Sequence, residues 1–141
     1  MSEISEEEFP RLLLDIIPET AEYFADKYGM PAPEAVRVED TWTDVYDILT
    51  DALMEPIIIP ELRSDSPDLE LLQRCFDFTE QLMTSKSGTL KEAVYFQVIE
   101  ALLGEDVPFQ KAFPYMGKKT WERTVRMLKD YEVDVPGVTD R

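Results

Sequence analysis

Apolar residues recur with a helical period along most of the chain, and this periodicity restricts the fold more than any other feature. Between Thr43 and Glu55 they occupy every position of the i, i+3, i+4, i+7, i+8 template. These positions are Val45, Ile48, Leu49, Ala52 and Leu53. The one run with strand-like propensity, Ile57–Ile59, is flanked by prolines and has no visible partner strand. The sequence therefore predicts an all-α fold, in which this run is a packed connection or a short helical turn, in the core or at an interface.

Start and stop signals divide the pattern into about six helices. The start signals are the capping boxes Ser5-x-x-Glu8 and Thr89-x-x-Glu92 and the pair Ser66-Pro67. Gly29 and Gly104 mark helix ends, and Pro56 is expected to stop or kink the third helix. The predicted helices span about residues 6–17, 18–28, 43–55, 66–84, 89–103 and 118–131, with loops at 30–41 and 105–117. Antiparallel pairs of such helices pack as a compact bundle or as a short stack resembling helical repeats.

Chain length and the absence of long apolar runs bound the domain organisation. A chain of 141 residues suffices for one domain without disulfides. We predict a single helical domain over residues 1–131 and a loosely ordered C-terminal tail over residues 132–141. No apolar run is long enough to cross a membrane, and the acidic N-terminus lacks the apolar core of a signal peptide. We therefore expect a cytoplasmic protein.

The chain is strongly acidic, and the acidic excess is unevenly distributed. The sequence has 30 acidic and 14 basic residues, for a net charge of −16. Residues 1–40 carry −8 and residues 41–86 carry −7, whereas residues 87–141 carry only −1. Charge segregated in this way favours a face of negative potential, which attracts basic partners and repels nucleic acid. The alternative is that the acidity serves solubility alone.

The residue types present exclude several kinds of catalytic site. The chain has no His, which excludes Ser-His-Asp and Cys-His catalysis. Its single cysteine rules out an internal disulfide and, without His, a Cys/His zinc site. Cys75 falls on the apolar face of a predicted helix, where we expect a buried and inert thiol. We therefore predict a protein that is not an enzyme and that binds no cofactor and no metal.

Carboxylates share one face of the helix predicted at residues 43–55, opposite its apolar stripe. Successive acids on this face are three or four residues apart, and like-charged pairs at this spacing destabilise a helix. No base between Val38 and Arg63 relieves this repulsion, and two aromatic residues lie beside the acids. We predict a protein-binding surface, on which the acids steer a basic partner and the aromatics anchor it. Its residues are Glu39, Asp40, Trp42, Asp44, Tyr46, Asp47, Asp51 and Glu55. The alternative is a solvated face with both aromatics packed inward.

A small, acidic, all-helical protein with such an aromatic-flanked carboxylate helix resembles the bacterial immunity proteins of toxin systems. The resemblance rests on the eight residues of the predicted surface. It implies an antitoxin that occludes a basic toxin, often a nuclease, by pairing carboxylates with the Lys and Arg that otherwise hold phosphate. It implies a basic protein partner, with no direct contact to nucleic acid or membrane, and leaves the oligomeric state open. A DNA-mimic inhibitor of a nucleic-acid enzyme is the closest alternative.

A further alternative is an enzyme. Glu19-x-x-Glu22 followed by Asp44-x-x-Asp47 is similar to the paired acidic motifs of all-α nucleotide pyrophosphohydrolases, in which helix pairs hold Mg²⁺. The second element has Asp where that family's pattern begins with Glu, and no basic cluster for phosphates lies nearby. This resemblance implies Mg²⁺-dependent nucleotide hydrolysis.

The only positive region of the sequence follows the fifth predicted helix. Residues 109–119 combine aromatics with bases, and Arg123, Arg126 and Lys129 continue the positive charge. We expect the aromatics to seal the end of the core and the bases to pair with the acidic part of the chain. Gly117, just before the last helix, leaves backbone N–H groups of that helix accessible to a carboxylate or another anion.

Overall fold

The computed structural model describes residues 4–38, 41, 44–104 and 109–138. Over these ranges the chain forms helices and no strand, which confirms the predicted all-α class. Adjoining helical elements join into eight continuous stretches, where about six were predicted. The two additional stretches are short, and they lie within the segments that were predicted to be loops.

The first helix begins close to its predicted capping signal. α1 spans Phe9–Ile16 and follows a turn at residues 6–8. The amide of Glu8 donates to Ser5 Oγ at 3.4 Å, and the Ser5 hydroxyl donates to Glu8 Oε1 at 3.1 Å. Pro10 lies in the first turn, where the missing N–H removes no helical hydrogen bond.

The second helix ends at a glycine, as predicted. A 3₁₀ turn, η1 (Pro18–Thr20), leads into α2 (Ala21–Tyr28). Gly29 follows with a φ of 62°, a left-handed conformation that glycine adopts without steric cost. The prediction of an uninterrupted loop after Gly29 is wrong, because α3 (Ala32–Ala35) follows directly. Pro33 lies in the first turn of α3, the one part of a helix that tolerates proline.

The third predicted helix continues through Pro56, which was expected to stop or kink it. α5 (Val45–Ile48), η2 (Leu49–Ile58) and α6 (Ile59–Arg63) form one uninterrupted helix. η2 is a π-helix, in which an amide bonds to the carbonyl five residues back, as Ile59 does to Met54. In an α-helix the ring of Pro56 would clash with the carbonyl four residues back, and the wider π-turn accommodates it.

The isoleucine run after Pro56 belongs to the core. Ile57, Ile58 and Ile59 are 7%, 0% and 6% exposed and lie within this long helix. The question of core or interface is therefore decided by the structure, since side chains this buried present no surface to a partner.

Two long helices form an antiparallel pair in the middle of the molecule. The first is α7 (Leu69–Thr84); the second runs through α8 (Gly88–Val94), η3 (Tyr95–Ile99) and α9 (Glu100–Gly104). Both begin at a cap that lies two residues from the predicted one. Asp68 Oδ1 accepts from the Leu71 amide at 3.1 Å, and Ser87 Oγ accepts from the Leu90 amide at 3.2 Å. Ser66 and Thr89 are therefore not the caps, because a nearer side chain already accepts the amide hydrogen bond.

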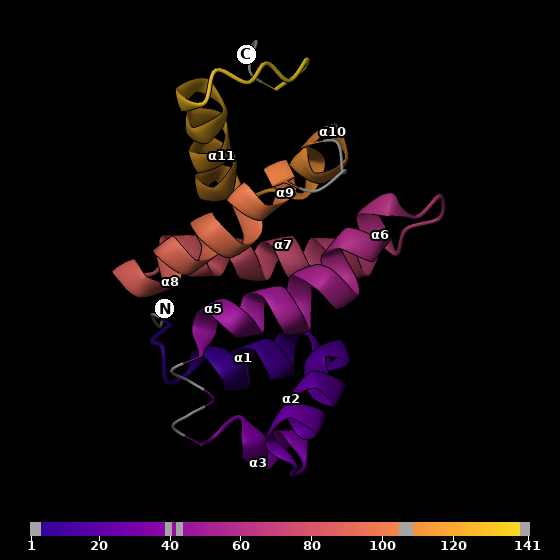
Figure 1. The fold of residues 1–141 in the computed structure, drawn as a ribbon, viewed down its shortest axis with the longest axis vertical. Helices are drawn as coiled ribbons and strands as arrows, with labels where there is room; N and C mark the ends of the chain where they lie inside the picture. Colours follow the sequence, from indigo (N-terminus) through magenta and orange to yellow (C-terminus); the bar gives the residue numbers. More distant parts are fainter. Residues whose placement is uncertain (1–3, 39–40, 42–43, 105–108, 139–141) are drawn as a thin grey trace.

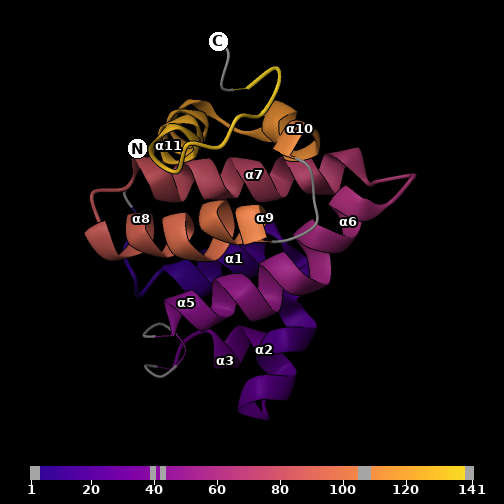
Figure 2. The ribbon, with the colours of Figure 1, turned by 45° about the horizontal axis from the view of Figure 1, so that its top comes forward.

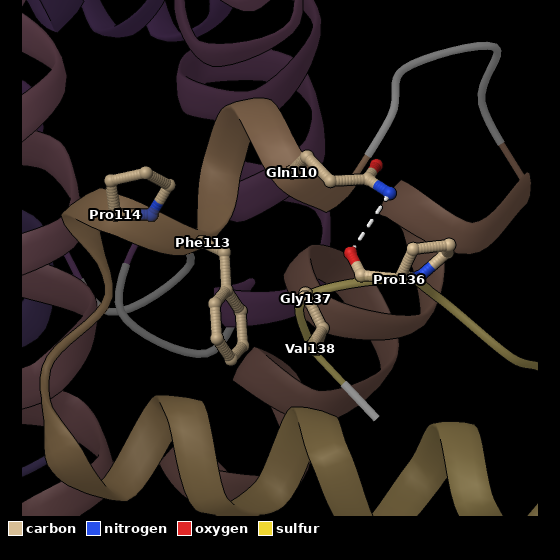
Figure 3. Close-up of a pocket in the computed structure, with 6 residues that line it drawn as sticks. All are labelled: Gln110, Phe113, Pro114, Pro136, Gly137 and Val138. Atoms are coloured by element: carbon tan, nitrogen blue, oxygen red, sulfur yellow. Dashed lines mark hydrogen bonds between the residues drawn. The ribbon is translucent and has the colours of Figure 1, made fainter. Parts of the chain in front are cut away.

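The C-terminal part contains another helical turn in a predicted loop. α10 (Phe109–Ala112) and η4 (Phe113–Tyr115) precede α11 (Lys118–Asp130). The chain then crosses back over α10, where Gln110 Nε2 donates to the carbonyl of Pro136 at 3.3 Å (Figure 3). Val135 and Val138 are buried, so the described part of the segment predicted as a tail packs against the domain. A hollow of about 380 Å³ lies between this segment and η4.

The helices are stacked along the long axis of the molecule roughly in chain order (Figure 1). α1, α2 and α3 form one end, α5 and α6 come next, α7 and α8 lie in the middle, and α10 and α11 form the other end (Figures 1 and 2). A continuous core runs through the stack, with Phe9, Phe24, Phe76 and Phe78 among its largest side chains. Because the stack follows chain order, the strongly acidic first two-thirds begin at one end and the nearly neutral last third reaches the other, and the two parts meet in the middle at α7 and α8.

Candidate functional site

Five of the eight residues of the predicted surface lie within the described chain. Asp44, Tyr46, Asp47, Asp51 and Glu55 lie on or directly before the helix formed by α5 and η2. Asp47, Asp51 and Glu55 are exposed, and Asp44 is half-buried. The other three residues, Glu39, Asp40 and Trp42, fall outside the described ranges.

Asp51 lines a groove between this helix and α2. The groove has a volume of about 530 Å³ and is open to solvent. From α2 and η1 it is lined by Glu19, Thr20, Glu22, Tyr23, Asp26 and Lys27, and from η2 by Asp51, Ala52 and Pro56. Four of these nine residues are acidic and one is basic, so the groove has a negative lining suited to cationic groups.

The α2 side of this groove lies outside the surface predicted from the sequence. Glu19, Glu22 and Asp26 are spaced by three and four residues, which puts them on one face of a helix. That spacing is visible in the sequence. What the sequence does not show is that this face lies against η2 and therefore shares a groove with Asp51.

Asp44 sits at the start of α5, close to the other acids. Its Oδ2 lies 3.8 Å from Lys27 Nζ, so this carboxylate has an ion-pair partner on α2. Burial raises the pKa of Asp44, and repulsion from Asp47 raises it further, although Lys27 acts in the opposite direction. Protonation of Asp44 therefore removes a negative charge that is partly buried and lies close to the charge of Asp47.

The hydroxyl of Tyr23 responds to the same acids from the α2 side. Burial raises the pKa of Tyr23 well above its usual value, and the negative charges of Asp44, Asp51 and Asp47 add to the rise. The hydroxyl oxygen is buried and makes no hydrogen bond within the described chain. Three carboxylates of the predicted surface thus act electrostatically on one hydroxyl beside the groove.

Tyr46 points away from the groove. Its hydroxyl donates to Glu92 Oε1 at 3.5 Å, and its carbonyl accepts from Gln97 Nε2 at 3.3 Å. Both partners lie on the helix that contains α8 and η3. The structure therefore does not bring Tyr46 together with Asp51 at the groove, although both lie on the predicted helix.

Glu19 is held in place from outside the groove. Arg74 on α7 donates to both oxygens of Glu19, at 2.9 and 3.0 Å, and to both oxygens of Glu70, at 2.6 and 2.9 Å. The same guanidinium donates to the carbonyl of Ile16 at 3.1 Å. These hydrogen bonds hold the pKa of Glu19 and of Glu70 below the usual glutamate range. Arg74 thereby ties the first helical turn beside the groove to the central helix.

The carboxylates do not converge as metal ligands. Within the residues that the structure describes, no group of three or more acidic or Cys side chains is close enough to hold a metal ion. Glu19 of the first paired acidic motif is occupied by Arg74, and Asp44 of the second faces Lys27. The geometry therefore offers no observation in favour of the pyrophosphohydrolase alternative.

Two other sequence features have structural roles. Cys75 is fully buried, and burial raises the pKa of its thiol to about 12, which keeps it unreactive. The start of α11 is capped by Glu80 of α7. Its carboxylate accepts hydrogen bonds from the amides of Lys119 and Thr120 at 2.8 and 2.9 Å. The expected carboxylate at this helix terminus thus comes from the protein itself.

The bases of the last third do not neutralise the acidic helix within the described chain. The ion pairs there join Lys27 to Asp44 and Arg74 to Glu19 and Glu70. Arg123 is instead positioned over the ring of Tyr95, at 3.9 Å from its centroid.

Every helix in the described ranges is too short or too polar to cross a lipid bilayer. Comparison of the chain with characterised proteins and with solved structures gives no match. A family model described as a domain of unknown function, DUF7674, matches residues 10–131. Because this match spans far more than half of the sequence, the chain belongs to the DUF7674 family.

Proposed function

We propose that this protein is an acidic binding protein of the immunity or antitoxin type, which inhibits a basic partner by covering its cationic residues. The observation that carries the proposal is the groove between α2 and η2, where Asp51 is combined with Glu19, Glu22 and Asp26. Because Arg74 already pairs with Glu19, the other three carboxylates of the groove are the ones that suit Lys or Arg side chains of a partner. In a toxin that acts on nucleic acid, those same cations would hold phosphate, so covering them blocks substrate binding.

The physical balance favours recognition over catalysis. The exposed acids beside the groove repel one another, which costs stability and is compensated when cations of a partner arrive. No convergent metal site is found among the described residues, and the one cysteine is buried. Binding of a positively charged partner therefore accounts for the clustered acids better than metal binding or covalent catalysis does.

The first prediction concerns the rate at which a partner associates. The partner is captured from the native host with the wild-type protein as bait, purified, and tested for inhibition of its own activity. Reversing a groove charge with Asp51→Lys is expected to slow association with this partner by about tenfold at low salt and to flatten its salt dependence, because electrostatic steering is lost. Stopped-flow or surface-plasmon measurements over a salt series give both quantities.

Glu122→Lys is the matched control, because Glu122 is an exposed acid on α11, at the other end of the molecule (Figure 1). It changes the net charge equally and is expected to leave the rate nearly unchanged. Equal rates for the wild type and Asp51→Lys would exclude the groove as the binding site. Competition by duplex DNA for the same partner separates a DNA mimic from a toxin-specific inhibitor. Hydrolysis of a nucleotide with Mg²⁺ would overturn the proposal in favour of the enzyme alternative.

A further inference from the structure

A row of exposed and half-buried aromatic and acidic side chains crosses three helices on a part of the surface that the groove does not include. Its centre is Phe96 on η3, which is 43% exposed. Glu92 and Glu100 lie four residues before and four residues after Phe96, so one helix face presents the order Glu, Phe, Glu. Leu69, Phe96 and Tyr131 are the large apolar residues that the described chain leaves exposed, and two of these three lie at this row.

Tyrosines from two other helices orient the two carboxylates. The hydroxyl of Tyr46, on α5, donates to Glu92 Oε1 at 3.5 Å. The hydroxyl of Tyr131, at the end of α11, donates to Glu100 Oε2 at 2.7 Å. Each glutamate flanking Phe96 therefore accepts a hydrogen bond from a tyrosine hydroxyl of a neighbouring helix. We call the set Tyr46, Glu92, Phe96, Glu100 and Tyr131 the aromatic row.

A fourth ring, that of Tyr95, contacts two residues of the row. Tyr95 packs edge-on against Phe96 with ring centroids 5.0 Å apart, and its hydroxyl lies 3.2 Å from that of Tyr131. Arg123 covers the face of the Tyr95 ring at 3.9 Å. These contacts hold exposed aromatic side chains in one arrangement before any partner arrives, which lowers the entropic cost of binding.

We propose that the aromatic row is a docking surface for a basic segment of a protein partner, one that presents an apolar side chain to Phe96 and cations to Glu92 and Glu100. Each glutamate uses one oxygen for a tyrosine hydroxyl, and neither is in an ion pair within the described residues. An exposed aromatic between two oriented carboxylates matches the composition of energetic centres in protein interfaces. This proposal rests on the proposed function in one respect, that the partner is basic.

Charge complementarity argues against the other occupants. Nucleic acid would bring phosphates against Glu92 and Glu100, on a chain whose net charge is −16. A second copy docked across a two-fold axis would bring the same two carboxylates of both chains together, which adds repulsion between like charges. A basic protein segment is the occupant for which both carboxylates and the aromatic contribute favourably.

The second prediction identifies the occupant directly. A phage-displayed library of random linear peptides is panned on the immobilised wild-type protein, and the enriched peptides are synthesised. We expect peptides with Lys or Arg on both sides of an apolar residue, and we expect Phe96→Ser to weaken their binding about tenfold or more, as truncation of a central aromatic anchor does. Isothermal titration calorimetry or fluorescence anisotropy measures the change.

Leu69→Ser is the matched control, because Leu69 is also exposed, at 62%, and lies on α7 outside the row. It is expected to leave peptide binding unchanged. Circular dichroism and the thermal midpoint confirm that the variants fold. Should Phe96→Ser fail to fold, Glu92→Gln and Glu100→Gln keep the shape of the row and remove its charge, and they are expected to weaken binding and reduce its salt dependence.

The outcomes separate the row from the groove. Enriched peptides that lose binding with Asp51→Lys and keep it with Phe96→Ser would support the groove and overturn the row. Loss with Phe96→Ser alone would support the row without the groove. Enrichment of acidic peptides, or of no peptide that distinguishes Phe96→Ser from the wild type, would overturn the proposal. So would a change confined to self-association in analytical ultracentrifugation, because that result assigns the surface to a second copy.

Discussion

At the scale of single residues, Gly117 shows how one missing side chain permits a contact between helices. A Cβ atom at this position would lie 2.5 Å from Cγ and Cδ of Glu80, closer than real contacts allow. Glycine at residue 117 therefore leaves room for the Glu80 side chain at the start of α11, and a Cβ there would push that side chain aside. The carboxylate of Glu80 accepts hydrogen bonds from the amides of Lys119 and Thr120 and from the hydroxyl of Thr120.

The third prediction follows from this close approach. Gly117→Ala pushes Glu80 away from the helix start, and we expect it to lower the free energy of unfolding by about 1–2 kcal/mol, the usual effect of losing a cap. Urea denaturation measures the change. Gly88→Ala is the control, because no atom lies within 4 Å of a Cβ there. That substitution is expected to stabilise by about 0.4–1 kcal/mol through the unfolded chain, and equal effects at both positions would contradict the argument.

At the scale of elements, the two π-helical stretches are joined by one glutamine. Gln97 on η3 donates through Nε2 to Thr50 Oγ1 at 2.6 Å and to the carbonyl of Tyr46 at 3.3 Å, both on the neighbouring helix. The carbonyl of Tyr46 also accepts the amide of Leu49, so the side-chain amide of Gln97 adds a second donor at the junction of α5 and η2. The contact also fixes the side of the long helix that carries Tyr46.

The fourth prediction tests this link between the two helices. Gln97→Leu leaves the hydroxyl of Thr50 without this donor, while the carbonyl of Tyr46 keeps only the amide of Leu49 from its helix. We expect a loss of about 1–2 kcal/mol in the free energy of unfolding. Gln81→Leu replaces an exposed glutamine on α7 and is expected to change stability by less than about 0.5 kcal/mol. Thermal or chemical denaturation of both variants decides the matter, and a neutral Gln97→Leu would show that the link contributes nothing.

At the scale of the whole molecule, Arg74 connects the end that carries the groove to the central layer. Its partners Glu19 and Glu70 have pKa values held below the usual glutamate value near 4.5. A carboxyl whose pKa is lower in the folded state stabilises the fold above its unfolded-state pKa. That stabilisation disappears as the pH falls through the folded-state pKa.

The fifth prediction is therefore that the free energy of unfolding of Arg74→Met falls less steeply at acid pH than that of the wild type. At neutral pH we expect this variant to be less stable by on the order of 1 kcal/mol for the Glu19 pair, a small value because solvent screens half-exposed ion pairs. Below pH 4.5 the difference from the wild type should shrink as both glutamates become protonated. Arg126→Met, which removes an exposed base from α11, is the control for net charge. Unfolding curves over a pH series show whether the two variants differ.

Much of this architecture could be predicted because it is local. A 3.6-residue period of apolar side chains encodes a helix and its buried face, so α1, α2, α7 and α11 lie where the sequence places them within two or three residues. Local sequence signals do not predict features that depend on contacts between segments far apart in the chain. The sequence cannot show that a π-turn accommodates Pro56, because that turn depends on how the long helix packs.

The candidate site divides in the same way. The sequence by itself determined an all-helical chain whose acids are concentrated in its first two-thirds, because helical period and charge are properties of residue order. Only the tertiary structure decided that α2 faces Asp51 across a groove, and that Tyr46 turns instead to Glu92 beside Phe96. The reason is physical: which helix faces meet depends on the burial of apolar surface between segments far apart in the chain, and no local pattern of residues records that choice.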